Sequence, residues 1–270
     1  MIAQLEMILL LLALIIGFIV LCTYCYCSFL RHNRGQSARI SRLEGVVEEL
    51  WERLRRQQEY YNYNIEWTDD GFNFFAMGNS LTLITSWGRG ICSTKPDNDY
   101  FGLLLDYLKT KTEDVVAHRW NYAIWERAQD RSSVLDLLDP FLSDKLNLVV
   151  IQLGENVLIT SEAEVERYEK DLGLLIDYVR SKTSPKTQLI VVDDFWDQER
   201  SKARKRVAAK GCLFADLAEI RGKKEYQSRE GTECLMLDGK KARVSKEAET
   251  HPGDEGMAFI ARRIIEDVKI

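Results

Sequence analysis

The sequence is poor in proline and histidine, and it has no excess of basic charge. Only 4 Pro and 16 Gly occur among 270 residues, which excludes a collagen-like or proline-rich design. Lys and Arg total 37 against 42 Asp and Glu, and the net charge of −5 argues against binding nucleic acid through a strongly basic surface. There is no phosphate-binding glycine loop, and the 3 His are too scattered for a metal cluster. The sequence therefore predicts a protein that uses neither a metal nor another cofactor.

Charged residues are also missing from Met7 to Leu30, a run of 24 residues that would form a helix of about 36 Å, enough to cross a bilayer. A cleaved signal peptide would have a basic start, a shorter apolar stretch and a small-residue cleavage site. Here Glu6 is the only charged residue before the run. We predict a retained, single-pass transmembrane helix, with the anchor and its basic flank covering residues 1–34 and the lipid bilayer as a partner.

Four arginines follow this run and no Lys or Arg precedes it, so the positive-inside tendency places the rest of the chain in the cytoplasm. They are Arg31, Arg34, Arg39 and Arg42. Three of the 6 cysteines lie in the apolar run or at its border, where palmitoylation is a simpler interpretation than zinc because no fourth ligand is near. They are Cys22, Cys25 and Cys27. The other three cannot all pair within one chain, which agrees with a reducing compartment.

A short heptad pattern follows the anchor. Apolar residues are spaced 3, 4, 3 and 4 apart, with Arg and Glu at most other positions, at Ile40, Leu43, Val47, Leu50 and Leu54. We therefore expect a helical, coiled-coil-like stalk over residues 35–66. Two interpretations stay open: a homodimer formed through this stalk, or a stalk that packs against its own domain.

Residues 67–270 alternate short apolar runs with longer helical patterns. The expected strands cover residues 72–77, 114–118, 146–153, 188–193 and 213–216. The expected helices cover residues 98–109, 134–142, 161–181, 197–210 and 253–268. Two of the strands are continuously apolar, as in strands covered by helices on both faces. We predict an α/β fold with a parallel central sheet, in which ligands bind beyond the carboxyl ends of the strands.

Three groups of polar residues lie where that fold would gather them. The first expected strand leads into Gly78-Asn79-Ser80-Leu81-Thr82, which places a hydroxyl in a strand-to-helix turn. The third leads into Gly154-Glu155-Asn156, and the last helix begins after His251-Pro252. A hydroxyl, an amide donor and an imidazole are the groups that acyl transfer needs. Each could also have a structural role, as a helix cap or a turn residue.

These blocks, in this order, resemble those of the SGNH (GDSL-type) hydrolase family over most of the chain from residue 72 onward. The resemblance implies a three-layer α/β/α, flavodoxin-like fold. It also implies Ser80 as nucleophile, His251 as general base and Asn156 as a side-chain oxyanion donor, with Gly154 in the same block.

The sequence departs from the family pattern at two positions. The family's second block, an Asn, four residues and a Gly, corresponds to Asn121 and then to Glu126 in place of the Gly, which puts a carboxylate at an expected oxyanion donor. The family's orienting Asp, three residues before the His, corresponds to Ala248. A nearby carboxylate or a backbone carbonyl would have to hold the imidazole. The carboxylate candidates are Glu247, Glu249 and Asp254.

The resemblance implies a metal-independent serine ester hydrolase of the SGNH type, acting on acetyl or other acyl esters of a carbohydrate or similar small substrate. Two alternatives stay open: an O-acyltransferase that uses the same acyl-enzyme, and a catalytically silent, membrane-tethered interaction module. Glycan-modifying relatives mostly work outside the cytoplasm, so an extracytoplasmic domain is the alternative to the arginine-based location. Four tryptophans near strand or loop ends are candidates for stacking on a sugar or for the core. They are Trp87, Trp120, Trp125 and Trp196.

Overall fold

The computed structural model describes residues 65–85, 87–236 and 239–270. They form one compact unit, Ile65–Ile270. The expected anchor (residues 1–34) and nearly all of the stalk (35–66) lie outside the described residues. Within the described ranges, no helix is long and apolar enough to cross a bilayer.

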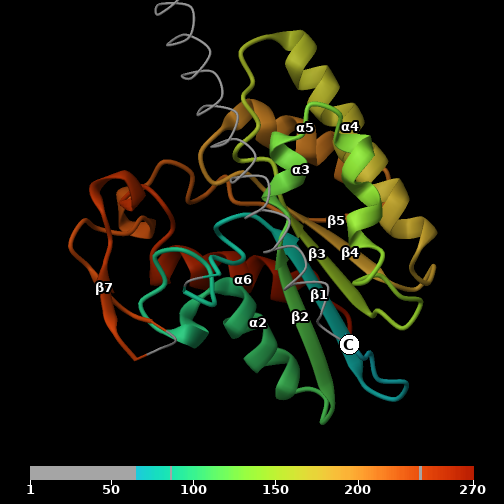
Figure 1. The fold of residues 1–270 in the computed structure, drawn as a ribbon, viewed down its shortest axis with the longest axis horizontal. Coiled ribbons are helices and arrows are strands. Elements are labelled where there is room, and N and C mark those ends of the chain that lie inside the picture. Colours follow the sequence, from blue (N-terminus) through green and yellow to red (C-terminus); the bar gives the residue numbers. More distant parts are fainter. Residues whose placement is uncertain (1–64, 86, 237–238) are drawn as a thin grey trace, which may run out of the picture. The chain divides into compact units, whose positions relative to one another are not determined.

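A five-stranded sheet with all strands parallel forms the centre of this unit (Figure 1). The strand order is β2-β1-β3-β4-β5. This is the flavodoxin-like order, and it confirms the α/β fold with a parallel sheet. The strands are β1 (Phe72–Gly78), β2 (Val115–Asn121), β3 (Leu148–Gln152), β4 (Gln188–Val192) and β5 (Leu213–Ala215).

Helices cover both faces of the sheet (Figure 1). α2 (Tyr100–Lys109) and α6 (Asp254–Asp267) pack together on one face, and α3 (Ala123–Arg127), α4 (Glu162–Ser181) and α5 (Gln198–Ala208) lie on the other. The strands are buried on both sides, because alternate residues of β1 and β3 pack on α2 and α6 while the others face the second layer. This explains why the sequence shows continuous apolar runs.

Among the helices that the structure describes, α4 is the longest, and it begins where its capping residues predict. Ser161 accepts a hydrogen bond from Glu164 N, and the Glu164 carboxylate accepts one from Thr160 N. The buried face is formed by residues at helical spacing, Tyr168, Leu172, Leu175, Ile176 and Val179. The helix therefore follows from the sequence alone.

Two expected elements differ in the structure. The helix expected over 134–142 is a 3₁₀ segment, Arg131–Leu138, because Pro140 has no N–H to donate to Asp136 O; Asp139 N donates to that oxygen instead. β2 is longer than expected and reaches Asn121, since Arg119 stays in register with Ala76 while its guanidinium bonds to Asp99 and Gly88 O.

The remaining described elements are short. They are the 3₁₀ turns Pro96–Asn98, Lys224–Tyr226 and Lys246–Ala248, and a hairpin of β6 (Glu233–Leu235) and β7 (Lys241–Arg243).

Candidate active site

Ser80 lies two residues beyond the end of β1, at the carboxyl edge of the sheet. Gly78, the last residue of β1, pairs with both Asn121 and Gln152. A Cβ at Gly78 would lie 1.8 Å from Thr82 Oγ1 and 2.8 Å from Gln152 O, so only glycine fits where the chain turns. Ser80 is half-buried, and among the described residues its backbone N–H has no acceptor. That N–H is therefore free to bind an oxyanion.

Asn156 follows the neighbouring strand, β3, at the same edge. Gly154 has φ +121°, and a Cβ there would lie 2.0 Å from Tyr168 Oη, so the turn requires glycine. Val157 N donates to Gly154 O and closes the turn, which leaves Asn156 exposed. Strand pairing of β1 with β3 thus brings the Ser80 and Asn156 turns together, as the sequence blocks predict.

Glu126, from α3, places a buried carboxylate next to this turn. Its Oε1 accepts hydrogen bonds from Gly154 N at 2.5 Å and from Asn79 Nδ2 at 2.9 Å, and its Oε2 accepts one from Asn156 Nδ2 at 2.5 Å. The side chain is therefore paired rather than left facing an oxyanion as an isolated charge. Its partners come from both the Ser80 turn and the Asn156 turn.

Asn79 joins two carboxylates. Its Nδ2 donates to Glu126 Oε1 and, at 2.6 Å, to Glu155 Oε2, while its Oδ1 accepts from Leu81 N. Glu155 also pairs with the fully buried Arg204 at 2.9 Å. Burial raises the pKa of Glu155, and the Arg204 guanidinium opposes that rise. An amide at position 79 can serve both carboxylates, whereas an Asp would bring a third negative group to the same place.

His251 precedes α6, and its imidazole is oriented by a backbone carbonyl. Nδ1 lies 3.0 Å from Ala248 O, and because a carbonyl only accepts, Nδ1 carries the proton and Nε2 is left with a free lone pair. The Trp196 ring packs edgewise on the imidazole at 5.3 Å, and its Nε1 donates to Thr250 O. Burial lowers the pKa of His251, and the hydrogen bond to Ala248 O opposes that change. The ring is thus suited to accept a proton at neutral pH.

The loop that follows Ser80 is bound to the segment that carries His251. Ile91 N donates to Ser80 O, Cys92 Sγ donates to Ala248 O, and Thr94 donates from N and from Oγ1 to the Asp254 carboxylate. These contacts connect the hydroxyl and imidazole segments across more than 150 residues of chain. The structure contains no direct hydrogen bond between the side chains of Ser80 and His251 themselves, both of which lie in its described part. Such bonds often tighten only when substrate binds.

Other candidates from the sequence make contacts of their own. Asn121 Nδ2 donates to Leu83 O, so it holds the chain after Ser80 to the end of β2. Glu249 pairs with Lys246, Glu247 bonds to Ser245, and Asp254 accepts from Thr94 and Asn98. Within the described residues, none of these three carboxylates bonds to His251; the Ala248 carbonyl has that place.

The four tryptophans divide into two pairs. Trp120 and Trp125 are buried in the core, at 4% and 0% exposure, so they cannot stack on a ligand. Trp196 is half-buried beside His251, and Trp87 is half-buried with the Arg89 guanidinium over its ring. Among the ring contacts of these four residues, the one that reaches a candidate site residue is that of Trp196 with His251.

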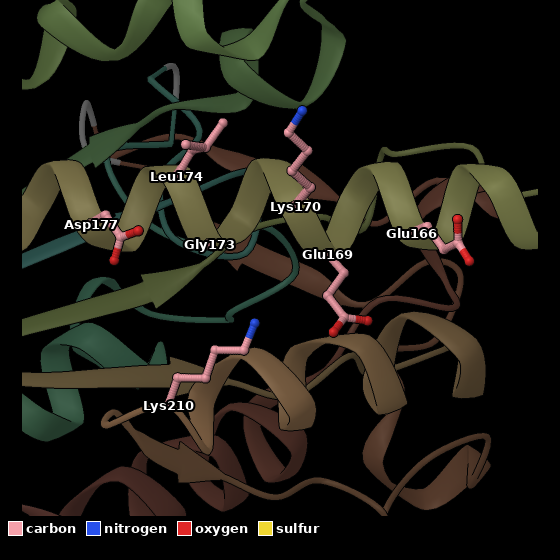
Figure 2. A pocket seen from close by; sticks show the side chains of 7 residues that line it. All are labelled: Glu166, Glu169, Lys170, Gly173, Leu174, Asp177 and Lys210. Atoms are coloured by element: carbon pink, nitrogen blue, oxygen red, sulfur yellow. The ribbon is translucent and has the colours of Figure 1, made fainter.

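A groove along α4 lies apart from this site. Figure 2 shows Glu169 on α4 and Lys210 just after α5 extending toward the space between the helices, while Leu174 points to the other side. A second groove lies beside residues 159–162, where acidic side chains predominate. Neither groove includes Ser80, Asn156 or His251.

Within the described ranges, no cluster of three or more His, Cys, Asp or Glu side chains is placed to hold a metal ion. Cys92, Cys212 and Cys234 are free thiols.

No protein-family model and no curated protein sequence matches the chain. Several solved structures resemble its fold. One is a two-domain esterase (CEX) active on acetylated mannans, co-crystallised with mannopentaose, with 18% identity over 72% of this chain and 48% of that one, and a TM-score of 0.45. Another is the salicylyl-acyltransferase SsfX3 from a tetracycline biosynthetic pathway, with 12% identity over 74% and 55% of the two chains and a TM-score of 0.46. The chain thus spans about half the length of these two proteins.

A third is a member of the lipolytic protein G-D-S-L family from Veillonella parvula, with 12% identity over 73% of this chain and 97% of that one, and a TM-score of 0.43. At such identities the likeness concerns the fold. The roles of individual residues rest on the geometry described above.

Proposed function

We propose that this protein is a serine ester hydrolase of the SGNH type that works through a Ser80–His251 pair. The observation that carries the proposal is the orientation of His251. The Ala248 carbonyl holds Nδ1–H and leaves Nε2 as the base, in a segment bound to the loop that follows Ser80. A half-buried hydroxyl and an exposed amide at one sheet edge supply the other groups that acyl transfer needs.

The chemistry proceeds in two steps. Ser80 Oγ attacks the ester carbonyl carbon while His251 Nε2 takes the hydroxyl proton, and the tetrahedral oxyanion accepts hydrogen bonds from Ser80 N and Asn156 Nδ2. The C–O bond to the alcohol breaks as His251 returns that proton to the leaving oxygen. Water then attacks the acyl-enzyme with His251 as base, which releases the carboxylic acid and restores Ser80.

Hydrolysis of p-nitrophenyl acetate by the full-length protein tests this proposal. We expect Ser80→Ala to reduce turnover to the background rate and His251→Ala to lower it by about 10²–10⁴-fold. Equal activity in the wild type and both variants would contradict it, as would an inactive wild type. Leu158→Ala, at an exposed position near Asn156, is the matched control and keeps full activity.

The proposed substrate class is an acetylated carbohydrate, because the half-buried Trp196 ring lies beside the imidazole and aromatic faces pack well on sugars. Release of acetate from acetylated oligosaccharides, compared with p-nitrophenyl acetate, tests this choice. Trp196→Phe keeps an aromatic ring but loses the hydrogen bond to Thr250 O, so the variant separates stacking from support of the His251 segment.

The same acyl-enzyme could transfer its acyl group to an alcohol instead of water. Consumption of the acyl donor that depends on an added glycan acceptor would favour such an O-acyltransferase. A silent interaction module would instead leave Ser80 unreactive toward a fluorophosphonate and would bind a membrane protein specifically.

We also propose that Met7 to Leu30 anchor the chain in a membrane, with the domain on the cytoplasmic side and the heptad stalk between them. Resistance of the full-length protein to alkaline extraction from membranes tests the anchor. Labelling of a surface cysteine introduced into the domain, in intact cells, tests the side: labelling by an impermeant reagent would contradict the cytoplasmic location. Crosslinking through the stalk tests the homodimer.

A further inference from the structure

Glu126 is a buried carboxylate whose charge is balanced by N–H groups. It is 3% exposed, and its oxygens accept from Gly154 N, Asn79 Nδ2 and Asn156 Nδ2. In the described part of the structure no Lys or Arg side chain forms an ion pair with it; the nearby Arg131 donates to its backbone oxygen. Burying an anion is costly unless it is well hydrogen-bonded, and here three N–H groups supply those bonds in place of a cationic side chain. We therefore ask what the carboxylate does for the groups that bind it.

The carboxylate lies beneath the oxyanion donors rather than in front of them. Glu126 is buried, whereas Ser80 is half-buried and Asn156 is exposed, so a substrate that approaches from solvent meets the hydroxyl and the amide first. The Asn156 amide nitrogen carries two protons, and one of them forms the hydrogen bond to Glu126. The second proton remains for an oxyanion.

We infer that Glu126 is a positioning residue that orients the Asn156 amide for the oxyanion, an inference that rests on the function proposed above. A carboxylate only accepts hydrogen bonds, so it fixes which end of the amide faces it. Without it, Asn156 can rotate and present its Oδ1 to the developing negative charge, which would oppose the reaction. The Gly154 and Asn79 N–H groups hold the carboxylate in place and offset part of its charge.

The variant Glu126→Gln tests this role with little change in size. A Gln side chain must turn its NH₂ group toward at least one of the three donors, and two donors repel each other. The preferred orientation of the Asn156 amide is then lost. We expect kcat for p-nitrophenyl acetate to fall by about 10–100-fold with little change in KM, by analogy with the loss seen when a hydrogen-bond partner that orients a metal-binding side chain is removed.

A double-mutant cycle distinguishes orientation of Asn156 from general support of the fold. If Glu126 acts through Asn156, then Glu126→Gln has no further effect on kcat once Asn156 is Ala. The double variant then equals Asn156→Ala alone. Effects that multiply across the two substitutions would overturn the inference while the wild-type activity still upheld the proposed function.

Asp193→Asn is the matched control for losing a buried carboxylate. Asp193 is 1% exposed, and its carboxylate accepts hydrogen bonds from Asp194 N, Leu217 N and Arg221. Within the described residues its side chain forms no hydrogen bond or ion pair with residues 79, 126 and 154–156. We expect this variant to lower the melting temperature but to keep kcat. An equal loss of kcat in Asp193→Asn and Glu126→Gln would show a structural effect and overturn the inference.

The NMR signal of the Asn156 side-chain amide gives a readout that does not depend on turnover. In full-length protein labelled with ¹⁵N-asparagine, that signal is assigned by its absence in Asn156→Ala. We expect one of its two protons to shift strongly downfield in the wild type, because it binds a carboxylate, and to lose this shift in Glu126→Gln. An unchanged signal would overturn the inference whatever the activity.

Discussion

His251 Nδ1 lies 3.0 Å from the carbonyl oxygen of Ala248, the residue three positions earlier in the chain. In the family that the sequence resembles, an Asp side chain is expected at that earlier position. Here the backbone of the same residue supplies the acceptor. A neutral carbonyl fixes the tautomer and the ring orientation as an Asp would, but it stabilises the imidazolium less because it carries no full charge.

The pH dependence of kcat/KM should report this difference. Burial lowers the pKa of His251, and the base must be neutral to accept the Ser80 proton. Activity is therefore present above the His251 pKa and falls as pH drops through it, with the acidic limb centred below 6.5, the ordinary imidazole value. An acidic limb above 6.5 would instead indicate a carboxylate partner.

Glu247→Gln and Glu249→Gln serve as controls for that pH profile. Neither carboxylate bonds to the imidazole, so both variants should keep the acidic limb and the plateau of the wild type. A downward shift of the limb in either variant would show that its carboxylate holds His251 during turnover.

Removing the exposed amide should affect the rate rather than binding. We expect Asn156→Ala to lower kcat by about 10²–10³-fold with a small change in KM, because the donor acts on charge that develops in the transition state. Steady-state kinetics with p-nitrophenyl acetate measure both constants. A rise in KM with kcat preserved would place Asn156 in ground-state binding instead.

The amide of Asn79 should be required because it serves two carboxylates. Asn79→Asp keeps the size of the side chain, but it replaces a donor with a third negative group between Glu126 and Glu155. We expect the free energy of unfolding at neutral pH to fall by about 1–3 kcal/mol, measured by urea denaturation. Gln198→Glu, which adds the same charge at the exposed start of α5, should change stability by less than about 0.5 kcal/mol. Equal stability of Asn79→Asp and the wild type would contradict the bridging role.

Two glycines should respond in opposite directions to alanine. Gly154→Ala places a Cβ 2.0 Å from Tyr168 Oη at φ +121°, so we expect a loss of about 1–3 kcal/mol in the free energy of unfolding. Gly173→Ala, in the middle of α4 with nothing within 4 Å of the new Cβ, should gain about 0.5–1 kcal/mol. A gain in the free energy of unfolding for Gly154→Ala as well as for Gly173→Ala would contradict the requirement for glycine at position 154.

Local sequence patterns predict most of the fold. The apolar runs and the capping residues of α4 mark their elements because each depends on neighbours close in sequence. The short helix α3 was not expected, since five residues show too little periodicity. The 3₁₀ segment before Pro140 differs from the expected α-helix because proline lacks the N–H that an α-helix would donate to Asp136 O.

The candidate site was predictable only in part. The blocks around Ser80, Asn156 and His251 indicate which residues to examine. The contacts of Glu126 join residues 28 to 47 positions apart and depend on α3 packing against the turns after β1 and β3. One signal was available: Glu126 stands where the family pattern has Gly. The hydrogen bond of Asn79 to Glu155 and the ion pair of Glu155 with Arg204 had no counterpart in local sequence.

Covalent labelling of the full-length protein with a fluorophosphonate tests the central claim most directly. The account predicts a single adduct on Ser80, located by peptide mass spectrometry. Its rate of formation should fall by about 10²–10⁴-fold in His251→Ala and should rise with pH through the His251 pKa in the wild type. Labelling at another residue, or at Ser80 with a rate that His251→Ala does not change, would contradict it.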